Sequence, residues 1–131
     1  MITYALRLKN GEDLNESLDS FIKNKNCKAA CILTCVGSLQ RAAIRFANQS
    51  ETKTLTGKFE IVSLVGTLSV HGSHIHIAVA DENGNLIGGH LKEGGVVFTT
   101  AEIVLGVLED VEFLRLHDEK TGYNELVIKP L

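Results

Sequence analysis

The sequence is short of several residue types and patterns that mark particular classes of protein. It has no Trp, one Pro and only 5% aromatic residues. Its longest apolar runs are interrupted within about a dozen residues, fewer than the roughly 20 needed to cross a bilayer, and no basic N-terminal region precedes an apolar block. We therefore expect no membrane-spanning segment and no secretory leader, and predict a cytoplasmic protein, or a nuclear one in a eukaryote.

Cationic residues are not in excess either. The chain has 13 Lys and Arg against 16 Asp and Glu, which gives a net charge of −3, and its pI is near 5.9. Nucleic-acid binding requires Lys and Arg clustered against the phosphates. Because the net charge is negative, we expect DNA binding by this chain alone to be weak or absent. The candidate basic patch that could outweigh this charge combines Lys23, Lys25 and Lys28.

Cysteine is scarce and is not spaced as a known ligand set. The chain has three cysteines, Cys27, Cys31 and Cys35, in a Cys-x3-Cys-x3-Cys pattern. This pattern matches neither a zinc-ribbon pair nor a disulfide framework, and it indicates an iron–sulfur cluster only weakly. Their Ala, Ile, Leu and Val neighbours favour reduced, partly buried cysteines on one face of a strand.

Common catalytic signatures are also missing. The sequence contains no Gly-x-Ser-x-Gly elbow, no glycine-rich phosphate loop and no Cys–His pair with supporting context. Whether the protein is an enzyme therefore depends on a metal site alone.

What the sequence does contain is one helical pattern among many short strands. The helix is predicted at 12–25, where apolar residues recur at helical spacing between first-turn acids and last-turn lysines. Gly37-Ser38 indicates a bend or bulge between two strands, and Gly66 ends another. Strands are predicted at 2–9, 28–36, 39–47, 55–65, 67–70, 74–80, 86–91, 96–109, 111–117 and 125–129.

This pattern predicts the fold class and the domain organisation. With 131 residues the chain suits a single domain, residues 1–131. We predict an α+β fold of mostly antiparallel β-sheet, partly barrel-like, with one main helix. Apolar strand edges on such a sheet are often covered by association into a symmetric oligomer.

Three of the five histidines, His74, His76 and His90, fall on the two strands of one predicted hairpin within residues 71–91, and a fourth, His71, precedes its first strand. Because side chains alternate along a strand, His74 and His76 share one face, and the aliphatic residues between and after them share the core face. The Asn83-Gly84 pair then supplies the positive φ that a reversal of the chain requires.

The loop length of this hairpin decides where the third histidine lies. A three-residue loop from Asn83 to Asn85 keeps one face apolar throughout and sets His90 opposite Ala78, diagonal to His76. A two-residue loop would mix polar and aliphatic residues on both faces. We therefore predict the odd loop, which gathers the three histidines.

His74, His76 and His90 together are a candidate metal site. Neutral imidazoles suit zinc, and three protein ligands leave one position open for water or substrate. The alternative is three hydrogen-bonded surface histidines. Small residues leave room beside the site: Ala78, Ala80 and Gly88.

The remaining polar candidates have plainer interpretations. His71 is expected to be a solvated loop residue rather than a fourth ligand, His117 a surface residue, and Asp81 a turn residue whose side chain bonds the backbone. Glu102 is a candidate general base or partner of a metal ligand. It can equally pair with Arg41 or Arg45 across a subunit interface.

Several motifs together resemble one family. They are LTCVGSLQRAAIRFAN at 33–48, GKFEIVSLVGTLS at 57–69, HIHIAVADENGNLIGGHL at 74–91 and TTAEIVL at 99–105. Together they resemble the plant-and-prokaryote-conserved (PPC) domain, which accompanies AT-hook motifs in plant nuclear proteins and stands alone in prokaryotes.

The resemblance implies a homotrimer, a predicted DNA-binding label, and a divalent metal, zinc or another, on His74, His76 and His90. The chain has no Arg-Gly-Arg-Pro core, so the AT-hook that contacts the minor groove in the plant proteins is missing. We expect a stand-alone PPC protein with a DNA-associated regulatory role and a three-histidine site. The alternatives are a metal-dependent enzyme or small-ligand binder, and a trimeric module for protein partners.

Overall fold

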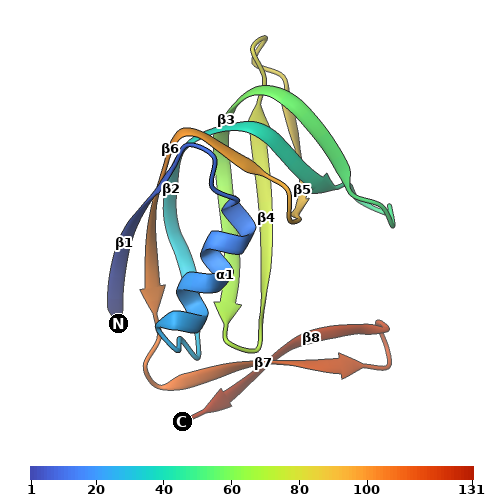
Figure 1. Ribbon diagram of the computed structural model, residues 1–131. Helices are drawn as coiled ribbons and strands as arrows, with labels where there is room; N and C mark the ends of the chain where they lie inside the picture. The colour runs from blue at the N-terminus through green and yellow to red at the C-terminus, as the bar shows by residue number, and fades with distance from the viewer.

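The computed structural model describes residues 1–131 and contains one helix and eight strands (Figure 1). In chain order these are β1 (Ile2–Lys9), α1 (Leu14–Asn24), β2 (Ala30–Arg45), β3 (Lys53–Ser69), β4 (Gly72–Ala80), β5 (Leu86–Leu91), β6 (Val96–Val107), β7 (Val111–Asp118) and β8 (Tyr123–Pro130). With 11 residues, α1 is the only helix, and no helix of the chain meets the length and apolarity needed to span a bilayer.

The first six strands form one antiparallel sheet in the order β1-β6-β2-β3-β4-β5. The sheet curls until its last strand returns to β2, where Ile44 pairs with Leu91 and Arg45 with His90. This extra pairing closes part of the sheet into a ring. The predicted α+β class, with a mostly antiparallel and partly closed sheet, is therefore confirmed.

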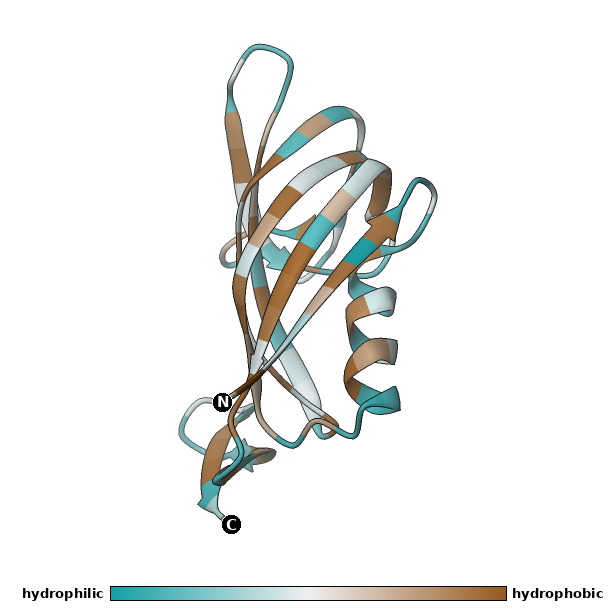
Figure 2. Ribbon diagram, turned by 90° about the vertical axis from the view of Figure 1, so that its left-hand side faces the viewer, coloured by the Kyte–Doolittle hydropathy of each residue, from teal (hydrophilic) through white to brown (hydrophobic).

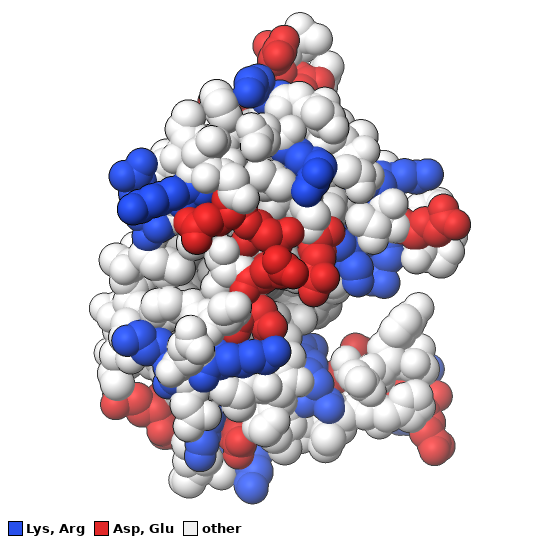
Figure 3. Space-filling model, in the orientation of Figure 1, with Lys and Arg blue, Asp and Glu red and all other residues white.

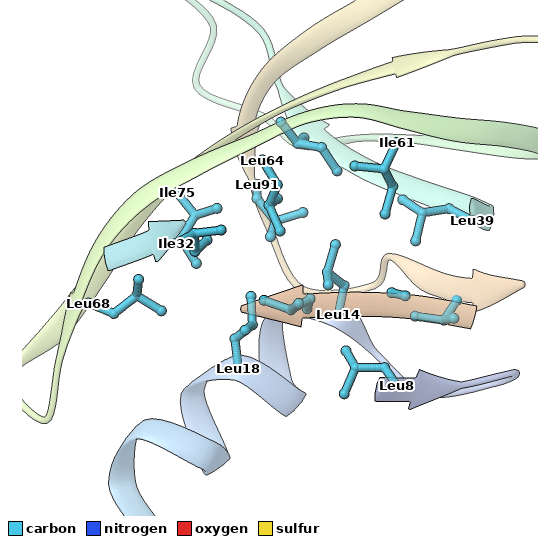
Figure 4. Close-up of a cluster of buried hydrophobic side chains, with 14 of the residues drawn as sticks. Leu8, Leu14, Leu18, Ile32, Leu39, Ile61, Leu64, Leu68, Ile75 and Leu91 are labelled. Atoms are coloured by element: carbon cyan, nitrogen blue, oxygen red, sulfur yellow. The ribbon is translucent and has the colours of Figure 1, made fainter. Parts of the chain in front are cut away.

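Helix α1 lies across the concave face of the sheet and fills its interior (Figures 1 and 4). Leu14, Leu18 and Ile22 follow one another at intervals of four residues and are fully buried, and burial of each contributes about 1.5–3 kcal/mol. Asp13 caps the helix, because its Oδ1 accepts from the backbone N–H of Glu16 at 2.9 Å. Hydrophobic and hydrophilic residues alternate along the strands, and the side of α1 that faces the strands is hydrophobic (Figure 2).

Strand β2 is one strand of 16 residues, so the prediction of two strands at 28–36 and 39–47 is wrong. The predicted irregularity is present, but it is a register shift between Gly37 and Leu39 within a continuous strand. A bulge of this kind bends a strand without ending it. A Cβ atom on Gly37 would lie 2.3 Å from the carbonyl oxygen of Thr100, so glycine permits the close approach of β6.

Strand β3 is continuous in the same way, which corrects the predicted break at Gly66 between strands 55–65 and 67–70. A Cβ atom on Gly66 would lie 2.7 Å from the carbonyl oxygen of His74. The glycine therefore serves the close packing of β4 against β3, and it does not end the strand.

Strands β7 and β8 form a separate hairpin that crosses below the main sheet (Figure 1). Three polar contacts attach it to the end of β3 and the start of β4. The Ser69 hydroxyl donates to the Phe113 carbonyl at 2.7 Å, and Arg115 donates to the Thr67 hydroxyl at 2.8 Å. The third contact joins His71 to Glu112 at 2.8 Å.

His71 is an exposed turn residue, as predicted, and it also contacts the β7–β8 hairpin. Its Nε2 lies 2.8 Å from a carboxylate oxygen of Glu112. This hydrogen bond is the main reason why the pKa of Glu112 lies below its usual range. His71 therefore fixes the hairpin and is not a member of the histidine cluster.

The close approach at Gly37 generates a stability prediction. Gly37→Ala should lower the free energy of unfolding by about 2 kcal/mol or more, because the added methyl group meets backbone atoms, which cannot move aside, and overpacking typically costs 1–3 kcal/mol. The matched control is Gly57→Ala in β3, where the nearest atom to a Cβ would be a ring carbon of Phe59 at 3.4 Å. Urea denaturation measures both, and equal stabilities for the two variants would contradict the assignment.

Candidate metal centre

The three histidines are presented by the β4–β5 hairpin, and Asp81 organises its turn. One oxygen of Asp81 accepts from the backbone N–H groups of Asn83 and Asn85, each at 2.9 Å. The bond from Asn85 is the largest reason why the pKa of Asp81 is lowered. Asp81 is therefore a turn residue, as predicted.

The observed turn corrects the predicted register by two residues. Strand β4 ends at Ala80 and β5 begins at Leu86, so the loop has five residues rather than three, and His90 lies opposite His76 rather than Ala78. The two backbone bonds to Asp81 stabilise this longer loop. Since both lengths are odd, the predicted division of faces survives, with Ile75 and Ile77 buried behind the histidines.

The histidine rings lie close together at the surface. The Nε2 atoms of His74 and His76 are 3.1 Å apart, and the ring centroids of His74 and His90 are separated by 5.2 Å. Those of His76 and His90 lie 5.7 Å apart. One nitrogen from each ring can be chosen so that all three lie within 4.8 Å of one another, so the predicted gathering of the three side chains is present.

One pair of nitrogens in this group has the spacing that a tetrahedral metal ion requires. Zinc–nitrogen bonds of about 2.0–2.1 Å require ligand nitrogens about 3.3 Å apart at tetrahedral angles. The 3.1 Å separation of the His74 and His76 nitrogens is close to this value. His90 projects from the facing strand, so the group could hold a divalent metal with three protein ligands.

The protonation of two of these rings also suits a metal. Burial lowers the pKa of His90 to about 4, with a further contribution from the positive charge of Arg45. Burial is also the first cause of the lowered pKa of His74, followed by His76 and Arg115. Because imidazole binds metal only in its neutral form, protons compete for His90 only at low pH, and they compete for His74 at a lower pH than for an ordinary histidine.

The cluster opens into a cleft of about 720 Å³. One wall is the end of β2 and the segment after it, and Gly88 and Gly89 of β5 contribute another part of the lining. Gly88 leaves room at the site, as predicted, and it is also required by packing, since a Cβ atom there would lie 2.6 Å from the carbonyl oxygen of Ile77. Ala78 and Ala80 do not line this cleft.

Residues from the hairpin and from β2 complete the surroundings. A second cleft of about 400 Å³ shares His74, His90 and Arg45 with the first, and Arg115 and Glu125 line it. Tyr123 at the hairpin tip lines both clefts. Sequence reasoning missed these hairpin residues at the site, because nothing in the sequence shows that β7 and β8 pack beside β4.

The other predicted candidates lie elsewhere. Glu102 is exposed on β6, opposite Arg7 on one side and Val36 on the other, and it lines neither histidine cleft. Arg41 donates to the Gly94 carbonyl at 2.7 Å. His117 is exposed on β7. The cysteines are free, with Cys27 buried and the other two partly buried.

Known proteins resemble this chain over nearly its whole length. It is 44% identical over 126 residues to the bifunctional protein GlmU of Synechococcus sp. (strain JA-3-3Ab). This match covers 96% of the chain but only 20% of that protein. It is 27% identical over 112 residues to AT-hook motif nuclear-localized protein 8 of Arabidopsis thaliana, covering 79% of the chain and 29% of the plant protein. The chain thus spans less than a third of either relative.

Solved structures share the fold. A hypothetical protein from Salmonella enterica has a TM-score of 0.97 and 43% identity, with coverage of 98% of this chain and 94% of that one. A metal-containing protein from Archaeoglobus fulgidus has a TM-score of 0.83 and 28% identity, covering 97% and 94%. The Plants and Prokaryotes Conserved (PCC) domain matches residues 1–109. The chain therefore belongs to that family, which is the PPC family that its motifs resemble.

Proposed function

We propose that this protein binds one divalent metal ion, zinc, through His74, His76 and His90, and uses the open coordination position for a small ligand. The observation that carries the proposal is the convergence of three ring nitrogens within 4.8 Å of one another in a cleft open to solvent. Zinc would supply a Lewis acid that polarises a bound oxygen and lowers the pKa of a bound water.

The donor set supports zinc over harder cations. Three neutral imidazoles without a carboxylate suit zinc, whereas calcium and magnesium prefer oxygen ligands. Glu125 lines the second cleft, of about 400 Å³, and not the first. A relative at 28% identity is called a metal-containing protein, which also supports a metal here.

A DNA-associated regulatory role is the second candidate, and the plant AT-hook relatives support it. The charge distribution opposes it. Acidic side chains gather in the middle of the face that α1 covers, and Lys and Arg lie in separate groups around them (Figure 3). Since phosphate binding depends on clustered cations, we rank the metal-dependent ligand binder first.

We also propose that the protein is a homotrimer, which the family resemblance implies. An exposed apolar stripe on β2 and β3 supports association: Leu33, Val36, Val62 and Val65 are 48–60% exposed. Register pairs on either side set these residues of the two strands opposite one another. Glu102 lies beside Val36, so an interface formed by this stripe would include Glu102, as its predicted interface role requires.

The three-histidine cluster generates the first functional prediction, which metal analysis of untagged protein tests. Wild-type protein loaded with zinc and desalted at neutral pH should retain about one zinc ion per chain, with His74, His76 and His90 as ligands. His76→Ala should reduce zinc affinity most, because His76 lies two residues from His74 on β4 and directly opposite His90 on β5. His117→Ala is the matched control and should retain the metal.

The dependence of zinc affinity on pH is an internal control for the same experiment. Zinc affinity should fall as the pH is lowered, because protonated imidazole cannot bind a metal. Wild-type protein without stoichiometric zinc, or full zinc occupancy in each of the variants His74→Ala, His76→Ala and His90→Ala, would refute the site.

The exposed stripe generates a prediction about assembly. Sedimentation equilibrium at micromolar concentration should give a mass near three times the 14.2 kDa of the chain. Val65→Lys should shift the protein to monomer, because a charge would be buried in the interface. Leu86→Lys, at a residue that is 64% exposed on β5, is the control and should remain trimeric. A monomeric wild type would contradict the homotrimer.

The charge distribution generates a prediction about DNA. Labelled random duplex DNA at physiological salt should show weak or no binding to this chain in fluorescence anisotropy, because the net charge of −3 opposes contact with phosphates and the sequence has no AT-hook core. Sub-micromolar affinity that is lost on replacing Lys23, Lys25 and Lys28 by Gln would instead support the regulatory role.

A further inference from the structure

We propose that Arg45 and Arg115 form an anion-binding subsite beside the three histidines, and that the ligand of this protein is a small molecule bearing a carboxylate or phosphate group. The inference rests on the proposed metal site and deepens it by naming the chemical class of the ligand.

Arg45 is a half-buried cation with no protein partner. Its guanidinium forms none of the side-chain hydrogen bonds of the structure and none of its ion pairs, whereas the other three arginines are engaged. Arg7 donates to Thr100, Arg41 to Gly94 and Arg115 to Thr67. A guanidinium group that is partly withdrawn from water and lacks an acceptor is well suited to bind an anionic ligand.

The fold holds Arg45 at the mouth of the histidine cluster. Arg45 is the direct cross-strand partner of His90 in the pairing that closes the sheet. Gly89 permits this approach, since a Cβ atom there would lie 2.5 Å from the carbonyl oxygen of Arg45. Arg45 lines both clefts that contain His74 and His90.

Arg115 approaches the same place from the hairpin. Its Nη2 donates to the Thr67 hydroxyl at 2.8 Å, which holds the side chain against the end of β3. The absence of a side chain at Gly72 leaves room for it, because a Cβ atom there would lie 3.2 Å from the Arg115 Cγ. This contact uses one nitrogen of the guanidinium and leaves others free to donate to a ligand.

The charges around the clefts favour an anion. The two clefts are lined by Arg45, Arg115 and one carboxylate, that of Glu125. Two cations thus face one carboxylate before any metal is bound, and a divalent ion on neutral imidazoles adds two further positive charges. A carboxylate or phosphate would neutralise part of this excess, while a cationic ligand would be repelled.

The size of the clefts fits a small molecule. Volumes of about 720 and 400 Å³ lie within the usual range of ligand pockets, about 300–1,000 Å³. An oxyanion bound to the arginines would hold the rest of the ligand beside the histidines. Tyr123 lines both clefts at the hairpin tip and adds an aromatic surface and a hydroxyl group.

Calorimetric titration with two defined anions tests the subsite. Malonate offers only carboxylates and phenyl phosphate only a phosphate, so the pair distinguishes the two sources of negative charge. Zinc-loaded wild-type protein should bind at least one of them. Arg45→Gln and Arg115→Gln should each weaken that binding about tenfold or more, since hydrogen bonds to charged groups are typically worth 1.5–3 kcal/mol.

Two further variants separate charge, geometry and fold. Arg45→Lys keeps the charge but loses the planar fork, and should bind the anion with intermediate affinity. Arg7→Gln removes the same charge from exposed Arg7 on β1, which neighbours only β6 in the sheet, and should bind like wild type. All variants should retain one zinc ion, and Arg45→Gln, Arg45→Lys and Arg7→Gln should also keep wild-type thermal unfolding. Arg115→Gln loses the hydrogen bond to Thr67 as well, so Arg45→Gln is the variant whose loss of anion binding cannot be ascribed to loss of metal or fold.

The outcomes are distinguishable. Absence of stoichiometric zinc in the wild type would overturn the proposed function and the subsite with it. Stoichiometric zinc with no binding of either anion at millimolar concentration, or with an affinity unaffected by both Gln variants, would overturn the subsite alone. Competition by a short duplex DNA for the Arg45-dependent site would show that the anion is a nucleic-acid phosphate, which would overturn the assignment of a small molecule.

Discussion

The pairing of β2 with β5 is the constraint on which the rest of the structure depends. It consists of two residue pairs, Ile44 with Leu91 and Arg45 with His90. The first pair is buried against the core, and the second lies at the histidine cluster. Because the sheet closes here, the concave face can enclose α1, and the strand that carries His90 is held on both sides. The same closure therefore supports the core and fixes the third candidate ligand beside Arg45.

Local patterns in the sequence are sufficient to predict much of the fold and of the site. Helical spacing predicts α1, since Leu14, Leu18 and Ile22 are all buried. Strand parity predicts that His74 and His76 share a face, and the apolar face of the hairpin predicts an odd loop that adds His90. The gathering of the three histidines could be predicted because they lie within 17 positions of one another in the sequence and depend on one register.

Features that depend on contacts distant in sequence could not be predicted. From the local sequence, Gly37 and Gly66 indicate breaks between strands. In the structure, each lies within a continuous strand and allows a neighbouring strand to approach closely. The loop of five residues depends on bonds to Asp81 that loop statistics do not specify. The arrival of Arg115 and Tyr123 at the clefts requires the docking of a hairpin about 40 residues away in sequence, for which hydrophobic periodicity contains no signal.

The proposed metal site and anion subsite would together give this member of the PPC family a chemistry that the family match does not specify. The central claim is that three imidazoles bind zinc and leave one position open, and X-ray absorption spectroscopy of the zinc-loaded protein tests it most directly. We expect three imidazole nitrogens and one oxygen atom, from water or a ligand, at about 2.0–2.1 Å from the zinc. A sulfur ligand at about 2.3 Å, from Cys27, Cys31 or Cys35, or fewer than three imidazoles, would contradict it.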